Sequence, residues 1–118
     1  MLKTLPEIVS ETKNSLRCLT ATEAREALAG RTEALVIDVR EPGEAQEKPV
    51  PGSVNIPRGI LEMKIPEYTT DPEHPIYVHC ATGGRSALAA AALIHMGFRN
   101  VYLLDCDCDS LIRELTVS

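Results

Sequence analysis

The chain has 118 residues, of which 44% are hydrophobic and 25% are charged. This length suits one domain with one core, because chains divide into several domains only beyond roughly 250 residues. The 12 basic and 17 acidic residues give a net charge of −5, whereas nonspecific attraction to nucleic acids or anionic membranes needs clustered basic side chains. We therefore expect a single domain over residues 1–118 that binds neither nucleic acid nor membrane.

The N-terminus and the cysteines bear on the cellular compartment. Charged residues interrupt the apolar ones within residues 1–15, which is atypical of a secretory signal. The longest apolar run, Ala87–Ile94, falls far short of the roughly 20 residues that span a bilayer. These features favour a cytoplasmic protein, in which cysteines are expected as free thiols. The cysteines are Cys18, Cys80, Cys106 and Cys108.

The first two predicted elements are helices. Apolar residues at helical spacing predict a helix over residues 2–13, within an N-terminal extension of residues 1–14. Thr20 and Glu23 have the spacing of a capping box, and they predict a second helix over about residues 21–29.

The rest of the chain alternates short strands and helices. The apolar run Ala34–Val39 is typical of a parallel strand that is buried on both faces. The predicted helix Ser86–Met96 is apolar almost all round and must also be buried. The predicted strands cover residues 16–19, 34–39, 53–56, 76–79 and 101–104, and the remaining helical segments cover residues 42–47, 60–65 and 110–115. This alternation predicts a three-layer α/β fold, with a central parallel sheet of about five short strands and helices on both faces.

Cys80 stands at the junction between a predicted strand and a glycine-containing loop. In open parallel sheets, ligands bind beyond the carboxyl ends of the strands. The adjacent Gly83 and Gly84 let amide N–H groups converge, and the following helix adds positive partial charge at its N-terminus. The loop is therefore predicted to bind an anion, with Ala81, Thr82, Gly83, Gly84, Arg85 and Ser86 as candidate binding residues.

An anion-binding loop would also activate the thiol of Cys80. A free cysteine is only about 3% ionised at pH 7, whereas a pKa lowered by about two units leaves roughly three quarters of it as thiolate. Backbone donors and Arg85 are expected to stabilise the thiolate. His79 precedes Cys80, but neighbouring strand residues point to opposite faces, so His79 is a poor general base for it.

Four collinear segments resemble the rhodanese superfamily, in the family's order and spacing. They are VIDVREP at Val36–Pro42, VPGSVNIP at Val50–Pro57, CATGGRS at Cys80–Ser86 and FRNVYLL at Phe98–Leu104. The resemblance implies a parallel α/β domain with a persulfide on Cys80. It also implies a sulfurtransferase that takes a sulfane sulfur from thiosulfate or a small persulfide and passes it to cyanide or a thiol.

By the same resemblance, backbone N–H groups from Ala81 to Arg85 would cradle the persulfide, without a cofactor or a metal. The implied partners are a small sulfur donor and a thiophilic acceptor, including a thiol-bearing protein. Related phosphatases and arsenate reductases have one more residue between cysteine and arginine, whereas four residues separate Cys80 from Arg85 here. The alternatives are a thiolate-based oxyanion or redox enzyme of that kind, and a rhodanese-like binding module without turnover.

The C-terminal segment departs from the family. Where many members have a glycine pair, an aromatic residue and a tryptophan, this chain has Asp105–Asp109, and a short helix follows. Cys106 and Cys108 would point the same way on an extended segment. They are interpreted as a thiol relay for the Cys80 persulfide or as cysteines near solvent, since a pair without further ligands argues against a metal site. Cys18 is assigned to the core.

Two further assignments concern the end of the predicted strand 34–39 and the acidic stretch Glu41–Glu47 that follows it. Asp38 and Arg40 leave this strand at the same sheet edge as the Cys80 loop. They are expected to pair with each other or to support the conformation of the loop without contacting the substrate themselves. The acidic stretch itself is interpreted as a solvated face.

Overall fold

The computed structural model describes residues 1–116, and a parallel sheet forms its centre. The strands are β1 (Arg17–Leu19), β2 (Leu35–Asp38), β3 (Ser53–Asn55), β4 (Ile76–His79) and β5 (Val101–Leu104), in the spatial order β1-β5-β4-β2-β3. All neighbouring pairs run parallel. The predicted parallel α/β sheet is therefore confirmed.

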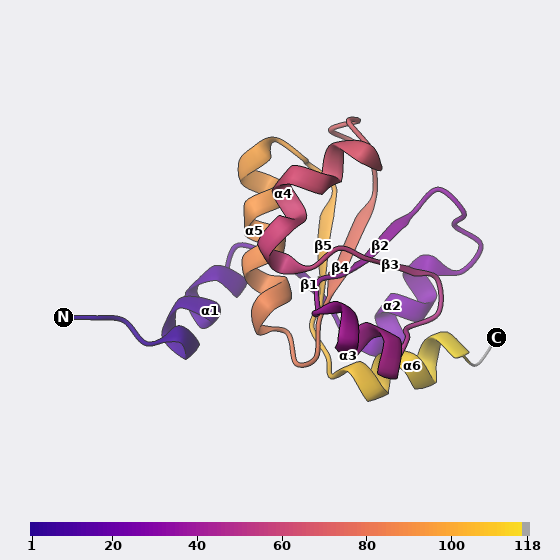
Figure 1. The fold of residues 1–118 in the computed structure, drawn as a ribbon, viewed down its shortest axis with the longest axis horizontal. Coiled ribbons are helices and arrows are strands. Elements are labelled where there is room, and N and C mark those ends of the chain that lie inside the picture. Colours follow the sequence, from indigo (N-terminus) through magenta and orange to yellow (C-terminus); the bar gives the residue numbers. More distant parts are fainter. Residues whose placement is uncertain (117–118) are drawn as a thin grey trace.

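Helices connect the strands and cover both faces of the sheet (Figure 1). They are α1 (Leu5–Lys13), α2 (Ala21–Leu28), α3 (Pro42–Glu47), α4 (Leu61–Lys64), α5 (Gly84–Met96) and α6 (Cys108–Thr116), and the 3-10 turns η1 (Arg58–Ile60) and η2 (Ile65–Glu67) flank α4. Within residues 1–116, no helix has both the length and the apolar character needed to cross a bilayer.

Side chains alternate along the strands and build two cores, one on each face of the sheet. On one face, Ile37 and Val78 pack with Leu61 of α4 and Leu93 of α5. A second cluster includes Val36, Tyr77, Ala24 and Leu111, and it joins the opposite face to α2 and α6. The sheet is thus the middle of three layers, as expected for parallel strands whose runs are apolar on both faces.

The N-terminal helix α1 contacts α5, but it buries none of its own residues. Thr4 and Glu7 form the capping box at its start. At its end, the ammonium of Lys13 lies 2.8 Å from Asp105 Oδ1, just after β5. Figure 1 shows α1 extending to one side of the sheet and its helices. It is therefore tied to the rest of the molecule mainly near its carboxyl end.

The final helix begins two residues earlier than the predicted start at Ser110. The Asp107 carboxylate accepts hydrogen bonds from the N–H and the hydroxyl of Ser110, both at 2.8 Å. This side-chain cap satisfies a free amide at the helix start. Cys108 consequently lies in α6, so the prediction that Cys106 and Cys108 share an extended segment is wrong.

The core between α5 and the sheet can be tested with two neighbouring residues. Leu93 is fully buried, whereas the next residue, Ile94, is 43% exposed. We expect Leu93→Ala to lower the free energy of unfolding by about 2–5 kcal/mol, because it leaves a cavity in the core. The matched control Ile94→Ala should cost about 1 kcal/mol or less. Urea denaturation measures both changes, and equal losses would contradict this packing.

Candidate functional site

Cys80 follows the last residue of β4, and the loop after it leads into α5. Its side chain is 1% exposed and joins the core between the sheet and α5. Gly83 caps the helix with φ +105°, in the left-handed region that favours glycine. A Cβ at Gly83 would also lie 3.0 Å from Asp105 Oδ1. Both constraints explain why a glycine closes this loop.

Hydrogen-bond donors surround the sulfur of Cys80. The Gly83 N–H donates to Sγ at 3.1 Å, and the Ser86 N–H donates at 3.4 Å. The Ser86 hydroxyl lies 3.2 Å from Sγ. The hydroxyl donates when the sulfur is a thiolate, because a thiolate only accepts hydrogen bonds. The loop thus holds three donors at one sulfur atom.

These donors lower the pKa of Cys80. Burial alone would raise the pKa of the thiol, because it disfavours the charged form. The hydroxyl and N–H of Ser86, together with the N–H groups of Gly83 and Thr82, act in the opposite direction and lower the pKa below its ordinary value. The loop therefore favours the thiolate, the nucleophilic form of cysteine, even though Cys80 is buried.

The predicted ring of backbone donors from Ala81 to Arg85 is narrower in the structure. The amides that form hydrogen bonds to Sγ are those of Gly83 and of Ser86, which lies one residue beyond the predicted range. The Thr82 N–H also lowers the pKa of Cys80, but it does not form such a hydrogen bond. The Arg85 guanidinium binds the Glu44 carboxylate through two hydrogen bonds of 2.7 and 2.9 Å. Arg85 thus contributes to the charge around the loop without contacting the sulfur.

Glu44 is a residue of the candidate site that the sequence interpretation missed, because it contacts Arg85 of the Cys80 loop. It lies in α3, within the acidic stretch interpreted as a solvated face, and its side chain is indeed 40% exposed, but it also pairs with Arg85, which that interpretation did not foresee. Its bonds to Arg85 and to the Glu41 N–H lower the pKa of Glu44 to about 2. The Glu44–Arg85 pair therefore stays charged at neutral pH and ties α3 to the first turn of α5.

Asp38 and Arg40 form the expected pair at the end of β2. Arg40 Nε and Nη2 donate to the Asp38 carboxylate at 2.8–3.1 Å, and both side chains are 3% exposed. Arg40 also donates to the Lys48 carbonyl at 2.7 Å. The Asn55 amide donates to the carbonyls of Asp38 and Arg40, each at 2.9 Å. This network fixes both ends of α3, and hence positions Glu44.

His79 is buried on the sheet face opposite Cys80. Its Nε2 lies 2.7 Å from the Ser53 hydroxyl, and its Nδ1 lies 4.0 Å from Asp38 Oδ1 without a hydrogen-bond partner among the described residues. Burial lowers the pKa of His79 to about 4, although Asp38 opposes the shift and Arg40 adds to it. His79 is therefore neutral at pH 7 and does not serve Cys80 as a base.

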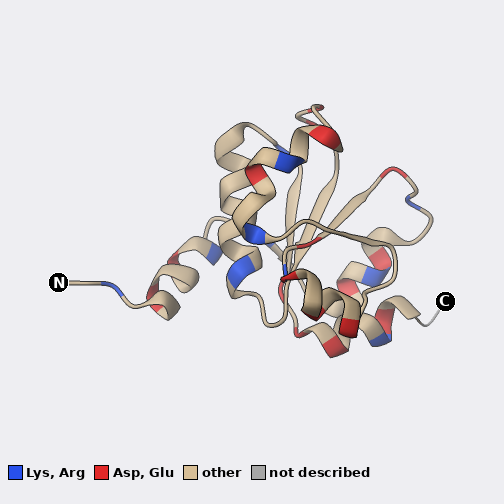
Figure 2. Ribbon diagram, in the orientation of Figure 1, with Lys and Arg blue, Asp and Glu red and all other residues tan. Residues whose placement is uncertain are grey.

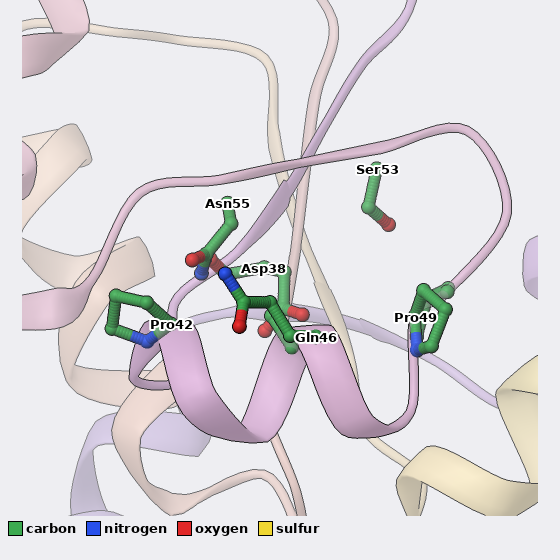
Figure 3. A pocket seen from close by; sticks show the side chains of 8 residues that line it. Asp38, Pro42, Gln46, Pro49, Ser53 and Asn55 are labelled. Atoms are coloured by element: carbon green, nitrogen blue, oxygen red, sulfur yellow. The ribbon is translucent and has the colours of Figure 1, made fainter.

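A pocket of about 390 Å³ lies on this second face, between β2, β3 and α3 (Figure 3). Its polar lining includes Asp38, Ser53, Asn55 and Gln46. None of the residues from Cys80 to Ser86 takes part in its lining. The pocket is consequently separate from the sulfur of Cys80.

The other three cysteines differ in exposure. Cys18 is exposed on β1, so its assignment to the core is wrong. Cys108 is buried at the start of α6, where its N–H donates to the Ala81 carbonyl at 2.9 Å and fastens α6 to the Cys80 loop. Burial and neighbouring carboxylates raise the pKa of Cys106 to about 11, and burial raises that of Cys108. Both thiols are therefore weak nucleophiles at neutral pH, and the relay stays a prediction.

Metal-ligand clusters are absent from residues 1–116, where no three His, Cys, Asp or Glu side chains gather closely enough to hold an ion.

Ser86 provides a direct test of thiolate stabilisation. In Ser86→Ala, the hydroxyl donor is lost while the Ser86 backbone N–H remains, so the pKa of Cys80 should rise. We expect alkylation of Cys80 by iodoacetamide to slow about tenfold at pH 7, because a hydrogen bond to a charged group is worth roughly 1.5 kcal/mol or more. The rate should recover at a pH well above the raised pKa. An unchanged pH–rate profile would contradict this role for the hydroxyl.

The lowered pKa of His79 predicts a pH-dependent stability. As the pH falls from about 6.5 towards 4, the unfolded chain takes up the proton first, so stability that is complete above pH 6.5 is lost. His79→Gln, which retains a polar end near Ser53, should remove this component, worth up to about 3 kcal/mol at pH 4. The measurement is urea denaturation of both proteins across this pH range. If the free energies of unfolding of the wild type and of His79→Gln changed in parallel with pH, the assignment of this component to His79 would be wrong.

Comparisons with known proteins agree with this architecture. YqhL of Bacillus subtilis (strain 168), described as uncharacterized, is 37% identical over 89 residues, which cover 75% of this chain and 67% of YqhL. Thiosulfate sulfurtransferase GlpE of Stutzerimonas stutzeri is 34% identical over 74 residues, or 61% of this chain and 64% of GlpE. The chain therefore matches about two thirds of the length of each relative.

A solved structure is similar over almost the whole chain. It is RPA3614 of Rhodopseudomonas palustris CGA009, described as a protein of unknown function and possible tyrosine phosphatase, with a TM-score of 0.80 and 28% identity over 94% of this chain and 90% of that one. A model of the rhodanese-like domain matches residues 20–113. This range contains the Cys80 loop and the strands β2 to β5, and the chain accordingly belongs to the rhodanese-like domain family.

Proposed function

We propose that the protein is a sulfurtransferase that carries a sulfane sulfur as a persulfide on Cys80. The observation that carries this proposal is the convergence of the Gly83 N–H, the Ser86 N–H and the Ser86 hydroxyl on a buried Sγ. Such a ring stabilises one negatively charged sulfur atom where water is scarce. In the proposed intermediate, such donors stabilise the negative charge of the persulfide.

The proposed reaction has two displacement steps. The Cys80 thiolate attacks the outer sulfur of thiosulfate or of a small persulfide, a new S–S bond forms, and the old one breaks. The electron pair leaves with sulfite or with the donor's thiolate. In the second step, cyanide or a thiol attacks the outer sulfur of the Cys80 persulfide, which restores the Cys80 thiolate. No external oxidant or reductant enters this cycle.

The partners in this proposal are a small sulfur donor and a thiophilic acceptor, which includes a thiol on another protein. Family membership and the likeness to GlpE, a named thiosulfate sulfurtransferase, support sulfur transfer in general. The proposal includes a cytoplasmic location, where the four cysteines stay reduced. It includes no cofactor.

The alternative is an oxyanion enzyme, and the description of RPA3614 as a possible tyrosine phosphatase is the observation that favours it. A phosphate-binding loop needs room for a tetrahedral anion and a free arginine to hold it. Here four residues separate Cys80 from Arg85, and Glu44 occupies the Arg85 guanidinium. Both observations favour transfer of a single sulfur atom.

Mass spectrometry of the intact protein tests the proposal. After incubation with thiosulfate or with a small persulfide, we expect one added sulfur atom on Cys80, and cyanide should remove it as thiocyanate. Cys80→Ser should abolish both steps, because no other described thiol has comparable donors. Cys18→Ser removes an exposed cysteine and is the matched control, in which sulfur addition and its removal by cyanide should both persist.

The outcomes separate the three classes of function. A protein that gains no sulfur from any donor would be a binding module. Turnover of an aryl phosphate or of arsenate without a persulfide would place it among the oxyanion enzymes.

A further inference from the structure

An open cleft of about 440 Å³ lies beside the Cys80 loop and is lined in part by Ala81 and Thr82. We propose that the donor used at this site is a low-molecular-weight persulfide without negative charge on its carbon skeleton, preferably one with an ammonium group, and not thiosulfate. This inference rests on the proposed sulfurtransferase function and specifies its substrate class. It follows from how the charges of the cleft are paired.

The cations at the cleft are already neutralised by partners within the molecule. The Arg40 guanidinium is buried and bound to Asp38. The Lys48 ammonium lies 3.0 Å from Asp109 Oδ1. Both cations thus already have a carboxylate partner, which is buried for Arg40 and exposed to solvent for Lys48.

Arg85, the cation of the loop itself, is also occupied. Its guanidinium forms a bidentate ion pair with the Glu44 carboxylate, and the lowered pKa of Glu44 keeps this pair charged at neutral pH. An anion that approached Arg85 would have to compete with a carboxylate held at 2.7 Å. The two N–H groups of Arg85 that would bind a dianion such as thiosulfate are instead bound to Glu44, and they connect α5 to α3.

Carboxylates exceed cations along the cleft. Its lining has the cations Arg40 and Lys48 and the carboxylates of Glu44, Glu47, Asp107 and Asp109, an excess of two negative charges. One negative charge remains even when the nearby Arg85 is counted. Figure 2 shows acidic segments on both α3 and α6, which contribute to this lining.

Two of these carboxylates have no cationic partner. Among the ion pairs within residues 1–116, none includes Glu47 or Asp107. The bonds from Ser110 lower the pKa of Asp107, so this carboxylate is ionised at neutral pH. Coulomb repulsion therefore opposes a dianion in the cleft, whereas an ammonium group gains attraction from Glu47 and Asp107.

The chemistry of persulfide donors fits such a cleft. The Cys80 thiolate attacks the outer sulfur of R–S–SH, a new S–S bond forms to Cys80 and the S–S bond of the donor breaks. The electron pair leaves on RS⁻, which takes a proton from water. The leaving group bears one charge until it is protonated, whereas thiosulfate releases a sulfite dianion. The step requires no anion subsite beyond the donors at Sγ.

The test uses donors of similar size and different charge. Aminoethyl, hydroxyethyl and carboxymethyl hydropersulfides, together with thiosulfate, are incubated with the protein, and the rate of sulfur addition to Cys80 is followed by mass spectrometry. We expect kcat/KM to fall in the order ammonium, hydroxyl, carboxylate, thiosulfate. Added salt should slow loading by the aminoethyl donor and speed loading by thiosulfate, because it screens attraction and repulsion alike.

Charge-neutral variants separate the effect of charge from the differing reactivity of the leaving thiols. Glu47→Gln and Asp107→Asn should each raise kcat/KM for thiosulfate about threefold at low ionic strength and lower it for the aminoethyl donor. The asparagine keeps an oxygen that can cap α6. The matched control is Glu67→Gln. Glu67 lies in η2, on the segment that leads to the start of β4, and it pairs with Lys64. The substitution removes the same charge far from Cys80 and should leave the ratio of the two rates unchanged.

Failure of this inference is distinguishable from failure of the proposed function. If no donor adds sulfur to Cys80, the sulfurtransferase proposal falls and the inference falls with it. If thiosulfate loads Cys80 fastest and the Glu47 and Asp107 variants leave the donor ratio unchanged, the sulfurtransferase stands and the charge inference is overturned.

Discussion

The central constraint is the stabilisation of negative charge on a cysteine sulfur that is buried inside the protein. Burial of Cys80 disfavours the thiolate, and three donors from Gly83 and Ser86 offset that cost. These donors come from the turn and first helical residues that follow β4, so they stay in place only while Gly83 keeps its left-handed backbone. The proposed chemistry thus depends on one loop conformation, and the cores on both sides of the sheet hold that loop.

Helix α3 links the sheet to this loop. The buried Asp38–Arg40 pair and the Asn55 amide fix the chain where it leaves β2, and Arg40 reaches the Lys48 carbonyl at the far end of α3. Glu44 then extends from α3 to Arg85. Pairs of this kind add little net stability in a solvated setting, but they fix geometry and local charge. In this molecule they set both the position of the loop and the polarity of the cleft beside it.

Several features of the site could be predicted from the sequence, and the reasons are local. Cys80 directly follows an apolar run and precedes two glycines, and this pattern needs no distant partner to be recognised. The pairing of Asp38 with Arg40 joins residues two apart at a strand end. The exposure of Cys18, in contrast, depends on β1 being the edge strand of the sheet. The early start of α6 depends on the Asp107 side chain capping it, which the CxC pattern obscured.

The sequence by itself determined the alternation of strands and helices, the two-sided burial of the sheet and the place of Cys80 at a strand end, because periodicity and turn residues act over a few neighbours. Only the tertiary structure decided which donors meet at Sγ and which charges stay unpaired. Arg85 and Glu44 are 41 residues apart, and nothing in their local sequence records that the fold brings them together. An arginine expected to attract anions is therefore neutralised by a carboxylate, since pairing at a distance follows from packing and not from pattern.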